Sequence, residues 1–289
     1  MDYASACFDV QGIFLRNKDK HITINIRGTM ITSTANRHVK NMIQLTKKAK
    51  LRQEQQVFLA EGLRIFEEMP KDRLEQVYVS ESFLQKAGHR ELLLDTACET
   101  VSDEVFQRMA DTQTPQGILC VVRQPQYTLS DLIENKHMLP HLLILEGIRD
   151  PGNLGTMFRT AEGAGATGII LSGCVDLFAP KTVRSTMGSI CRVPFYITKD
   201  LAETLFEIKK QGVCVYAAHL KGTKCYDAFD YRGASAFLIG SEGNGLTQEA
   251  AAMADVYLKI PMGGSLESLN AAMAAGILMY EANRQRRRQ

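Results

Sequence analysis

The sequence predicts a two-domain α/β protein whose larger, C-terminal domain contains a mostly parallel sheet. After Pro140, short runs that are apolar throughout alternate with helical patterns, as expected for strands covered by helices on both faces. The 289 residues also exceed the length of one average domain. A smaller α/β domain is therefore predicted to precede the sheet domain.

The first 29 residues differ in pattern from the rest of the chain. Residues 21–26 alternate in polarity as a strand does, but the surrounding sequence offers little to pack against them. Met30 opens a segment typical of a natural N-terminus, with Asn36 as a candidate helix N-cap. We therefore interpret residues 1–29 as a peripheral extension and hypothesise that synthesis begins at Met30, which N-terminal mass spectrometry tests.

Residues 30–123 have the pattern of a small α/β domain. Its predicted elements are a helix at 36–52, a helix that carries Leu63 and stops at Pro70, a strand at 76–79, a helix at 102–109 capped by Ser102, and a strand at 118–122.

Residues 124–138 are polar, contain Pro125 and are predicted to be a linker, which leaves 139–289 as the second domain. The elements predicted for that domain are strands at 142–145, 168–171, 213–218, 236–239 and 256–260, and helices at 153–164, 200–211 and 268–287.

Composition excludes several classes of protein. No apolar run approaches the ~20 residues that span a bilayer. The seven cysteines are scattered without a CxxC pair, which argues against a disulfide framework and a zinc site. His137 and His141 have HxxxH spacing but flank Pro140, so no metal is predicted. A reduced, cytoplasmic protein is the simplest interpretation.

Three glycine-bearing loops follow predicted strands of the second domain, at 146–155, 240–245 and 261–270. In open parallel sheets ligands bind outside the carboxyl ends of the strands. Glycine also lets the backbone approach a ligand closely. The three loops together therefore predict one ligand site.

Other nucleotide-binding motifs fail on their positions. Residues 163–168 match G-x-G-x-x-G, but they close a helix and precede a strand, the reverse of a dinucleotide fingerprint. Neither a P-loop nor the G-x-S-x-G elbow of hydrolases occurs. A nucleotide-dependent oxidoreductase is thereby disfavoured.

The three loops resemble the ordered motifs of SpoU-type (TrmH) RNA ribose 2′-O-methyltransferases, members of the SPOUT superfamily. N-x-G-x-x-x-R-x-A is met by Asn153, Gly155, Arg159 and Ala161. A strand followed by G-x-E-G-x-G is met at 237–245, and I-P-M-x-G-x-x-x-S-L-N at 260–270. The N-terminal domain is similar, more weakly, to the L30/L7Ae-like substrate-binding domain of that family.

The resemblance implies a C-terminal trefoil knot, a homodimer formed through that domain, and S-adenosylmethionine as cofactor. It implies these site residues: Arg159, Asn153, Glu242, Ser268 and Asn270 as catalytic, and Gly240, Gly245, Ile260, Met262 and Leu269 as cofactor-binding. Arg159 either accepts the proton or stabilises the developing alkoxide, and Glu242 orients either Arg159 or its own loop. Ser268 also has the position of an N-cap for the last helix.

The implied activity is methylation of a ribose in structured RNA, with 23S ribosomal RNA favoured over transfer RNA. A catalytically silent RNA-binding or ribosome-assembly protein is the alternative from another class. The net charge of +2 conceals local excess, because residues 36–64 hold seven basic side chains against two acidic ones. From this cluster the predicted RNA contacts are Arg37, Lys40, Lys47, Lys48, Lys50 and Arg52, and the arginines at 284 and 286–288 form a second basic group.

Overall fold

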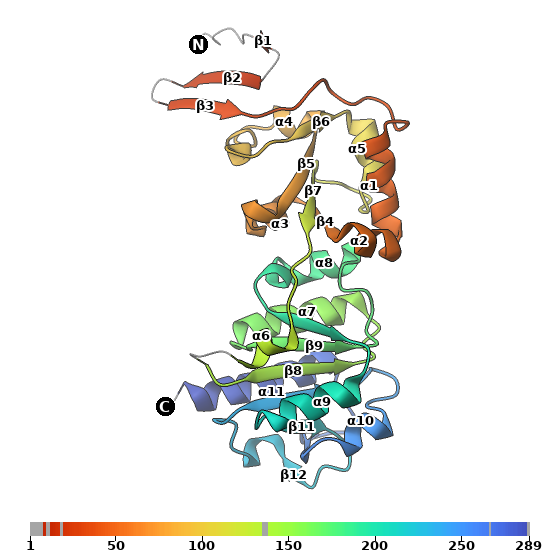
Figure 1. Cartoon of the computed structure of the whole chain (residues 1–289), viewed down its shortest axis with the longest axis vertical. Helices are drawn as coiled ribbons and strands as arrows, with labels where there is room; N and C mark the ends of the chain where they lie inside the picture. Colours follow the sequence, from red (N-terminus) through yellow and green to blue (C-terminus); the bar gives the residue numbers. More distant parts are fainter. Residues whose placement is uncertain (1–7, 10–11, 18–19, 135–137, 266, 288–289) are drawn as a thin grey trace. The chain divides into compact units, whose positions relative to one another are not determined.

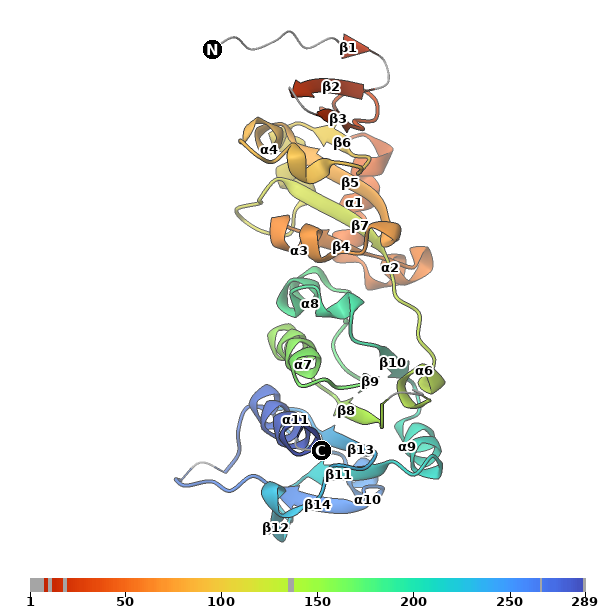
Figure 2. The same cartoon turned by 90° about the vertical axis from the view of Figure 1, so that its left-hand side faces the viewer.

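The computed structural model describes the backbone of residues 8–9, 12–17, 20–134, 138–265 and 267–287, and side chains from residue 25 onward within those ranges (Figures 1 and 2). The chain forms two compact units. Unit 1 comprises Met1–Gln124 and Phe178–Arg184, and unit 2 comprises Pro125–Leu177 and Ser185–Gln289.

Unit 1 is built on a four-stranded sheet in the order β4-β7-β5-β6. β7 runs antiparallel to β4 and β5, while β5 and β6 are parallel. The strands are β4 (Val57–Glu61), β5 (Leu74–Ser80), β6 (Glu99–Val101) and β7 (Ile118–Arg123). The helices are α1 (Arg37–Lys47), α2 (Ala49–Gln55), α3 (Leu63–Glu68), α4 (Glu81–Gln85) and α5 (Asp103–Met109).

The predicted N-caps of this unit are confirmed. The Asn36 side chain accepts from the His38 N–H at 2.8 Å, and the Ser102 hydroxyl accepts from the Val105 N–H at 3.4 Å. The single helix predicted at 36–52 is instead two helices, because Lys48 adopts extended backbone angles (φ −113°, ψ 105°) between α1 and α2.

The N-terminal segment is more closely tied to unit 1 than predicted. The predicted strand is present as β3 (Lys20–Ile24), which pairs with β2 (Gly12–Asn17), and β2 pairs with β1 (Phe8–Asp9). Beyond it, the Arg27 N–H donates to the Cys98 carbonyl and the Cys98 N–H to the Asn25 carbonyl, both at 2.9 Å. Residues 25–27 therefore add to the sheet edge beside β6, and describing all of 1–29 as peripheral is wrong.

One short segment assigned by sequence to the second domain groups with unit 1. Within this unit the Phe178 ring stacks on Phe58 with centroids 5.6 Å apart. Arg184 Nη2 lies 2.8 Å from Asp111 Oδ2. The boundary predicted from composition misses this return of the chain, since composition does not record long-range contacts.

Unit 2 confirms the predicted parallel sheet. Its order is β10-β9-β8-β13-β11-β14-β12, and every neighbouring pair is parallel. The strands are β8 (His141–Glu146), β9 (Gly168–Ser172), β10 (Phe195–Thr198), β11 (Cys214–Ala218), β12 (Lys224–Cys225), β13 (Ser235–Ile239) and β14 (Val256–Lys259).

Helices cover both faces of this sheet. Figure 2 shows α7 and α11 on one face and α6 and α9 on the other. The helices of unit 2 are α6 (Leu129–Ile133), α7 (Pro151–Gly163), α9 (Leu201–Lys210), α10 (Gln248–Ala252) and α11 (Ala271–Arg286). The remaining helix, α8 (Pro180–Thr186), lies mostly in the segment that groups with unit 1. As predicted, α7 ends at Gly163 and β9 begins at Gly168, so the G-x-G-x-x-G match is a helix C-terminal turn.

The predicted linker is not a loop throughout. Thr128 caps α6 through a reciprocal capping box with Asp131, and Leu132 is fully buried in the core of unit 2. Residues 125–134 therefore belong to this unit, while His137 lies outside the described residues.

Arg286 fixes the C-terminal end of α11 to the sheet. Its guanidinium donates to five acceptors, at distances from 2.6 to 3.1 Å: the carbonyls of Tyr231, Leu139, Pro140 and Gly233, and the Ser235 hydroxyl. Arg284 pairs with Glu281 at 2.6 Å. Arg286, a member of the predicted C-terminal basic group, therefore has a structural role, because its guanidinium binds backbone carbonyls.

Within the described ranges no helix is both long and apolar enough to cross a membrane. The same ranges hold no group of three or more His, Cys, Asp or Glu side chains arranged to bind a metal ion.

Candidate active site

The three glycine-bearing loops meet at one edge of the unit 2 sheet. They follow β8, β13 and β14, which end at Glu146, Ile239 and Lys259. Because all these strands are parallel, their carboxyl ends lie at the same edge. The sheet therefore brings together segments that are far apart in the sequence.

Three polar side chains, one from each loop, form a hydrogen-bonded chain. Asn270 Nδ2 donates to Asn153 Oδ1 at 3.1 Å, and Asn153 Nδ2 donates to Glu242 Oε1 at 2.7 Å. An ionised carboxylate only accepts, so the Glu242 end fixes which way the Asn153 amide points. This network connects all three motifs through predicted catalytic residues.

The position of Asn153 follows from the start of α7. Asp150 caps the helix by accepting from the Asn153 N–H at 2.8 Å, and Pro151 occupies the first turn. A Cβ atom at Gly155 would lie 2.6 Å from the Ser185 carbonyl carbon. Glycine at this motif position thus permits a close backbone approach, whereas the sequence suggested contact with a ligand.

The loop that carries Glu242 doubles back on itself. Ser241 and Gly245 exchange backbone hydrogen bonds at 3.0 and 2.9 Å. A Cβ at Gly240 would lie 2.1 Å from the Gly245 carbonyl carbon, and Gly245 itself has φ +67°. Both glycines are therefore required for this tight turn, at the tip of which Glu242 reaches Asn153.

Asn270, and not Ser268, caps the last helix. The Asn270 side-chain oxygen accepts from the N–H groups of Ala272 and Met273 at 2.9 and 3.3 Å. Its amide nitrogen remains available for Asn153, so one residue both begins α11 and enters the network. Ser268 is exposed and makes no hydrogen bond within the described residues, and the helix begins at 271 where the sequence predicted 268.

Arg159 lies on α7, six residues after Asn153 and therefore about 9 Å further along the helix axis. Its side chain is exposed and has no ion pair or hydrogen bond to the described part of the chain. Glu242 was predicted to orient either Arg159 or its own loop. Within the described residues it instead accepts from Asn153 on the neighbouring loop and has no hydrogen bond or ion pair to Arg159.

The predicted cofactor residues are distributed over two of the loops. Gly240 and Gly245 form the base of the tight turn. Ile260 and Met262 are half-buried just beyond β14, and Leu269 is 37% exposed beside Asn270. Figure 2 shows the segment between β14 and α11 extending outward from the sheet.

Comparison with known proteins agrees with the motifs. The profile of the SpoU rRNA Methylase family matches residues 140–280, and that of the MRM3-like substrate binding domain matches residues 36–120. The chain is 33% identical over 254 residues to the 23S rRNA (guanosine(2553)-2′-O)-methyltransferase RlmP of Bacillus subtilis, spanning 86% of this chain and 97% of that protein. The chain belongs to the SpoU rRNA methylase family.

Solved structures of this family have the same architecture. The AdoMet-bound rRNA methyltransferase of Sinorhizobium meliloti is 32% identical, with a TM-score of 0.72 over 89% of this chain and 97% of that one. The SpoU methyltransferase AviRb of Streptomyces viridochromogenes is 25% identical, with a TM-score of 0.76 over 88% and 98%. The class predicted from the motifs, an RNA 2′-O-ribose methyltransferase, is confirmed.

The predicted RNA contacts of this SpoU family member divide into two groups. Arg37, Lys40, Lys47, Lys48 and Lys50 are exposed on or beside α1 and α2. Arg52 is different, because it is only 4% exposed and its guanidinium donates to the carbonyls of Leu45 and Thr46. Its assignment as an RNA contact is wrong: the side chain satisfies the carbonyls at the end of α1.

Two residues at this edge were not predicted from the sequence. Glu146, the last residue of β8, accepts two hydrogen bonds from Thr247, the N-cap of α10. The signal for Thr247 was present, since a threonine followed by Gln248 and Glu249 is typical of a helix start. No pattern in the sequence indicated Glu146 as its partner.

Proposed function

We propose that this protein transfers a methyl group from S-adenosylmethionine to a ribose 2′-hydroxyl of 23S ribosomal RNA. The observation that carries the proposal is the chain Asn270–Asn153–Glu242, which joins the three motif loops at the carboxyl edge of the sheet. The choice of 23S ribosomal RNA as substrate is supported by the Bacillus subtilis relative, which matches along 97% of its length and is named for 23S rRNA.

The backbone of these loops is accessible to a cofactor. A Cβ at Gly243, Gly245, Gly263 or Gly264 would meet no atom within 4 Å, so the backbone there is open to a ligand. We assign backbone contacts to Gly240, Gly245, Ile260, Met262 and Leu269, retaining the predicted set. When bound, S-adenosylmethionine supplies the methyl group.

Arg159 provides the charge that this reaction requires. Guanidinium stays protonated at all physiological pH values, so it is better suited to holding a phosphate and stabilising the developing alkoxide than to removing a proton. Its exposure and lack of an internal partner within the described residues leave it available to RNA. Proton acceptance by Arg159 is the competing mechanism, and it predicts a rate that keeps rising with pH as guanidinium deprotonates.

Asn153, Glu242, Ser268 and Asn270 complete the proposed catalytic set. The hydrogen-bonded network holds Asn153, Glu242 and Asn270 in fixed positions around the ribose. Alignment of reacting groups lowers a barrier by at most ~7–11 kcal/mol. Ser268 is exposed beside Asn270, where its hydroxyl can bind the substrate or the cofactor carboxylate.

Unit 1 is proposed to hold the RNA, as an L30/L7Ae-like domain. The exposed lysines 47, 48 and 50 supply phosphate contacts at the junction of α1 and α2.

For unit 2 we propose the trefoil knot of the superfamily and a homodimer. The dimer is supported by an apolar stripe on α11, where Met273 and Tyr280 are 59% and 49% exposed and Ile277 lies between them. Light scattering of the purified protein tests the dimer. A cytoplasmic location follows from the substrate.

Mapping ribose methylation in total RNA from a strain that lacks the protein tests the substrate. We expect one 23S rRNA site to lose its methyl group and to regain it with the wild-type protein, but not with Arg159→Ala. Loss of a transfer RNA mark instead would redirect the proposal to that substrate. Titration calorimetry with S-adenosylmethionine tests the alternative of a catalytically silent RNA-binding or ribosome-assembly protein, which predicts no binding.

A further inference from the structure

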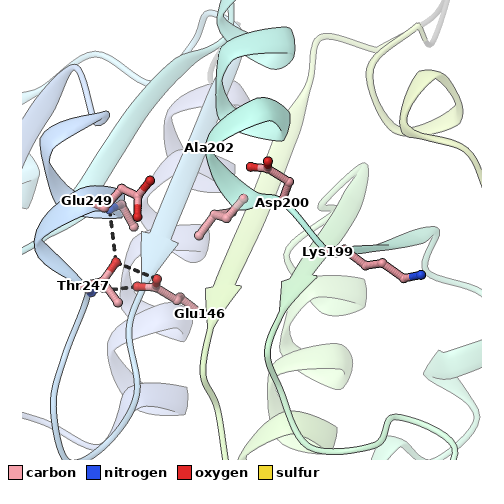
Figure 3. Close-up of a pocket in the computed structure, with 8 residues that line it drawn as sticks. Glu146, Lys199, Asp200, Ala202, Thr247 and Glu249 are labelled. Atoms are coloured by element: carbon pink, nitrogen blue, oxygen red, sulfur yellow. Dashed lines mark hydrogen bonds between the residues drawn. The ribbon is translucent and has the colours of Figure 1, made fainter.

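Glu146 and Thr247 hold together two of the loops of the candidate active site. The Thr247 backbone N–H donates to Glu146 Oε2 and its hydroxyl donates to Glu146 Oε1, both at 2.8 Å (Figure 3). The same hydroxyl accepts from the Ala250 N–H at 3.1 Å. Because the hydroxyl oxygen accepts from α10, its hydrogen points toward Glu146. Each oxygen of the Glu146 carboxylate therefore faces one donor of Thr247, and an ionised glutamate can accept both hydrogen bonds.

No cation accounts for this carboxylate. Glu146 forms no ion pair with any described residue, and Figure 3 shows the Lys199 side chain extending away from it. Glu146 and Thr247 instead border a cavity of about 200 Å³ at the N-terminal ends of α9 and α10. The half-buried carboxylate is therefore held at the rim of an open space, with Thr247 as its partner.

The pair is one of two connections between the same two loops. Residues 146 and 153 bound the loop after β8, and residues 242 and 247 lie on the segment after β13. Asn153–Glu242 is the outer connection and Glu146–Thr247 the inner one, next to the ends of the strands. If the inner connection breaks, the turn at 240–245 is free to pivot, and Glu242 and Asn153 lose their alignment.

We propose that Glu146 and Thr247 are positioning residues for methyl transfer, which hold the 240–245 turn in the geometry that takes S-adenosylmethionine. The inference rests on the proposed function, because it assigns the cofactor to that turn. In this role the pair acts through the residues it aligns, since Glu146 and Thr247 bond to each other.

Substitutions in the full-length protein test the pair. Thr247→Val removes the hydroxyl at almost constant shape, Glu146→Gln replaces one acceptor by a donor, and Thr247→Ser keeps the hydroxyl. Thr128→Val is the matched control, because it removes the N-cap hydroxyl of α6. Affinity for S-adenosylmethionine is measured by calorimetry, and kcat and the KM for RNA by methyl transfer at saturating cofactor.

We expect Thr247→Val and Glu146→Gln each to weaken cofactor affinity about tenfold, the effect of one hydrogen bond to a charged group, and to lower kcat with an unchanged KM for RNA. Thr247→Ser should retain wild-type affinity within about twofold. The double variant should be no worse than either single variant, since both break the same contact. Thr128→Val should lower the melting temperature alone.

Wild-type affinity and kcat in both Thr247→Val and Glu146→Gln would overturn the inference, as would additive losses in the double variant. If Thr247→Val does not fold, Glu146→Gln and Thr247→Ser carry the same comparison. A wild-type protein that binds cofactor but methylates no 23S rRNA contradicts the proposed substrate. In that case the S-adenosylmethionine affinities of the variants still test the role of Glu146 and Thr247. If the wild-type protein methylates 23S rRNA and the variants are unaffected, only the positioning role of Glu146 and Thr247 is contradicted.

Discussion

Gly155→Ala tests the packing that places α7 in the active site. A Cβ there would lie 2.3 Å from Ser185 Cβ, 2.6 Å from its carbonyl carbon and 2.9 Å from its Cα. Two of these atoms are backbone, so α7 must retreat by roughly 1 Å, and overpacking of this kind costs ~1–3 kcal/mol. Alanine regains about 1 kcal/mol of helix propensity, which leaves a net loss of ~0–2 kcal/mol.

Gly276→Ala is the matched control, because Gly276 lies in α11 and faces α7. Its Cβ would meet the Thr160 methyl at 3.3 Å, a contact that a shift of a few tenths of an ångström relieves. Helix propensity then dominates, and this variant should be unchanged or more stable by up to ~1 kcal/mol.

The two variants are compared by thermal unfolding and by methyl transfer at saturating substrate. Gly155→Ala should melt at or below the wild-type temperature and lose activity by about a hundredfold, because an error of 1 Å at Asn153 disrupts alignment. Gly276→Ala should melt at or above wild type and remain active. A Gly155→Ala protein with wild-type melting temperature and activity would refute the steric argument.

Three further predictions concern other parts of the molecule. Arg159→Ala should lower methyl transfer by at least about a hundredfold while leaving S-adenosylmethionine affinity within a few-fold, and full activity would remove Arg159 from the site. Burial, with a smaller contribution from Arg286, lowers the pKa of His141 to about 4. Only the unfolded chain then takes up the proton between pH 6.5 and 4, so this group alone removes ~3 kcal/mol of stability as the pH falls through that window. His141→Gln should flatten the dependence of the unfolding free energy on pH there, and an unchanged slope would contradict the assignment. Replacing Lys47, Lys48 and Lys50 by alanine should reduce the slope of log affinity for RNA against log salt by about 2–3. An unchanged slope would place the RNA elsewhere.

Much of the architecture follows from local patterns, because each pattern has one physical solution. Runs that are apolar throughout can be satisfied only inside a covered sheet, and that sheet is present. Asn36 and Ser102 are short polar side chains directly before apolar periodicity, and both cap helices as predicted. The loops after β8, β13 and β14 meet because parallel strands share their carboxyl edge.

The features that escaped prediction depend on distance and burial. β10 was missed because it is a four-residue edge strand that comes directly after Pro194 and leaves Ile197 53% exposed, so its apolar signal is weak. Arg52 was placed on the surface because charge counting does not detect the change of direction at Lys48, which buries the guanidinium against α1. The Asn153–Glu242 contact spans 89 residues, and no local pattern encodes it.

The two ends of α11 lie at opposite edges of the same sheet. Asn270 begins the helix beside the proposed cofactor turn, and Arg286 ends it on carbonyls near the starts of β8 and β13. A helix of 16 residues separates the two ends by about 24 Å. Proteolysis just before Arg286 would remove no residue of the active site, yet it would remove five hydrogen bonds that hold the far end of the helix whose first residues order that site. Arg286 thereby makes catalytic competence sensitive to damage at a part of the chain that is remote from the active site.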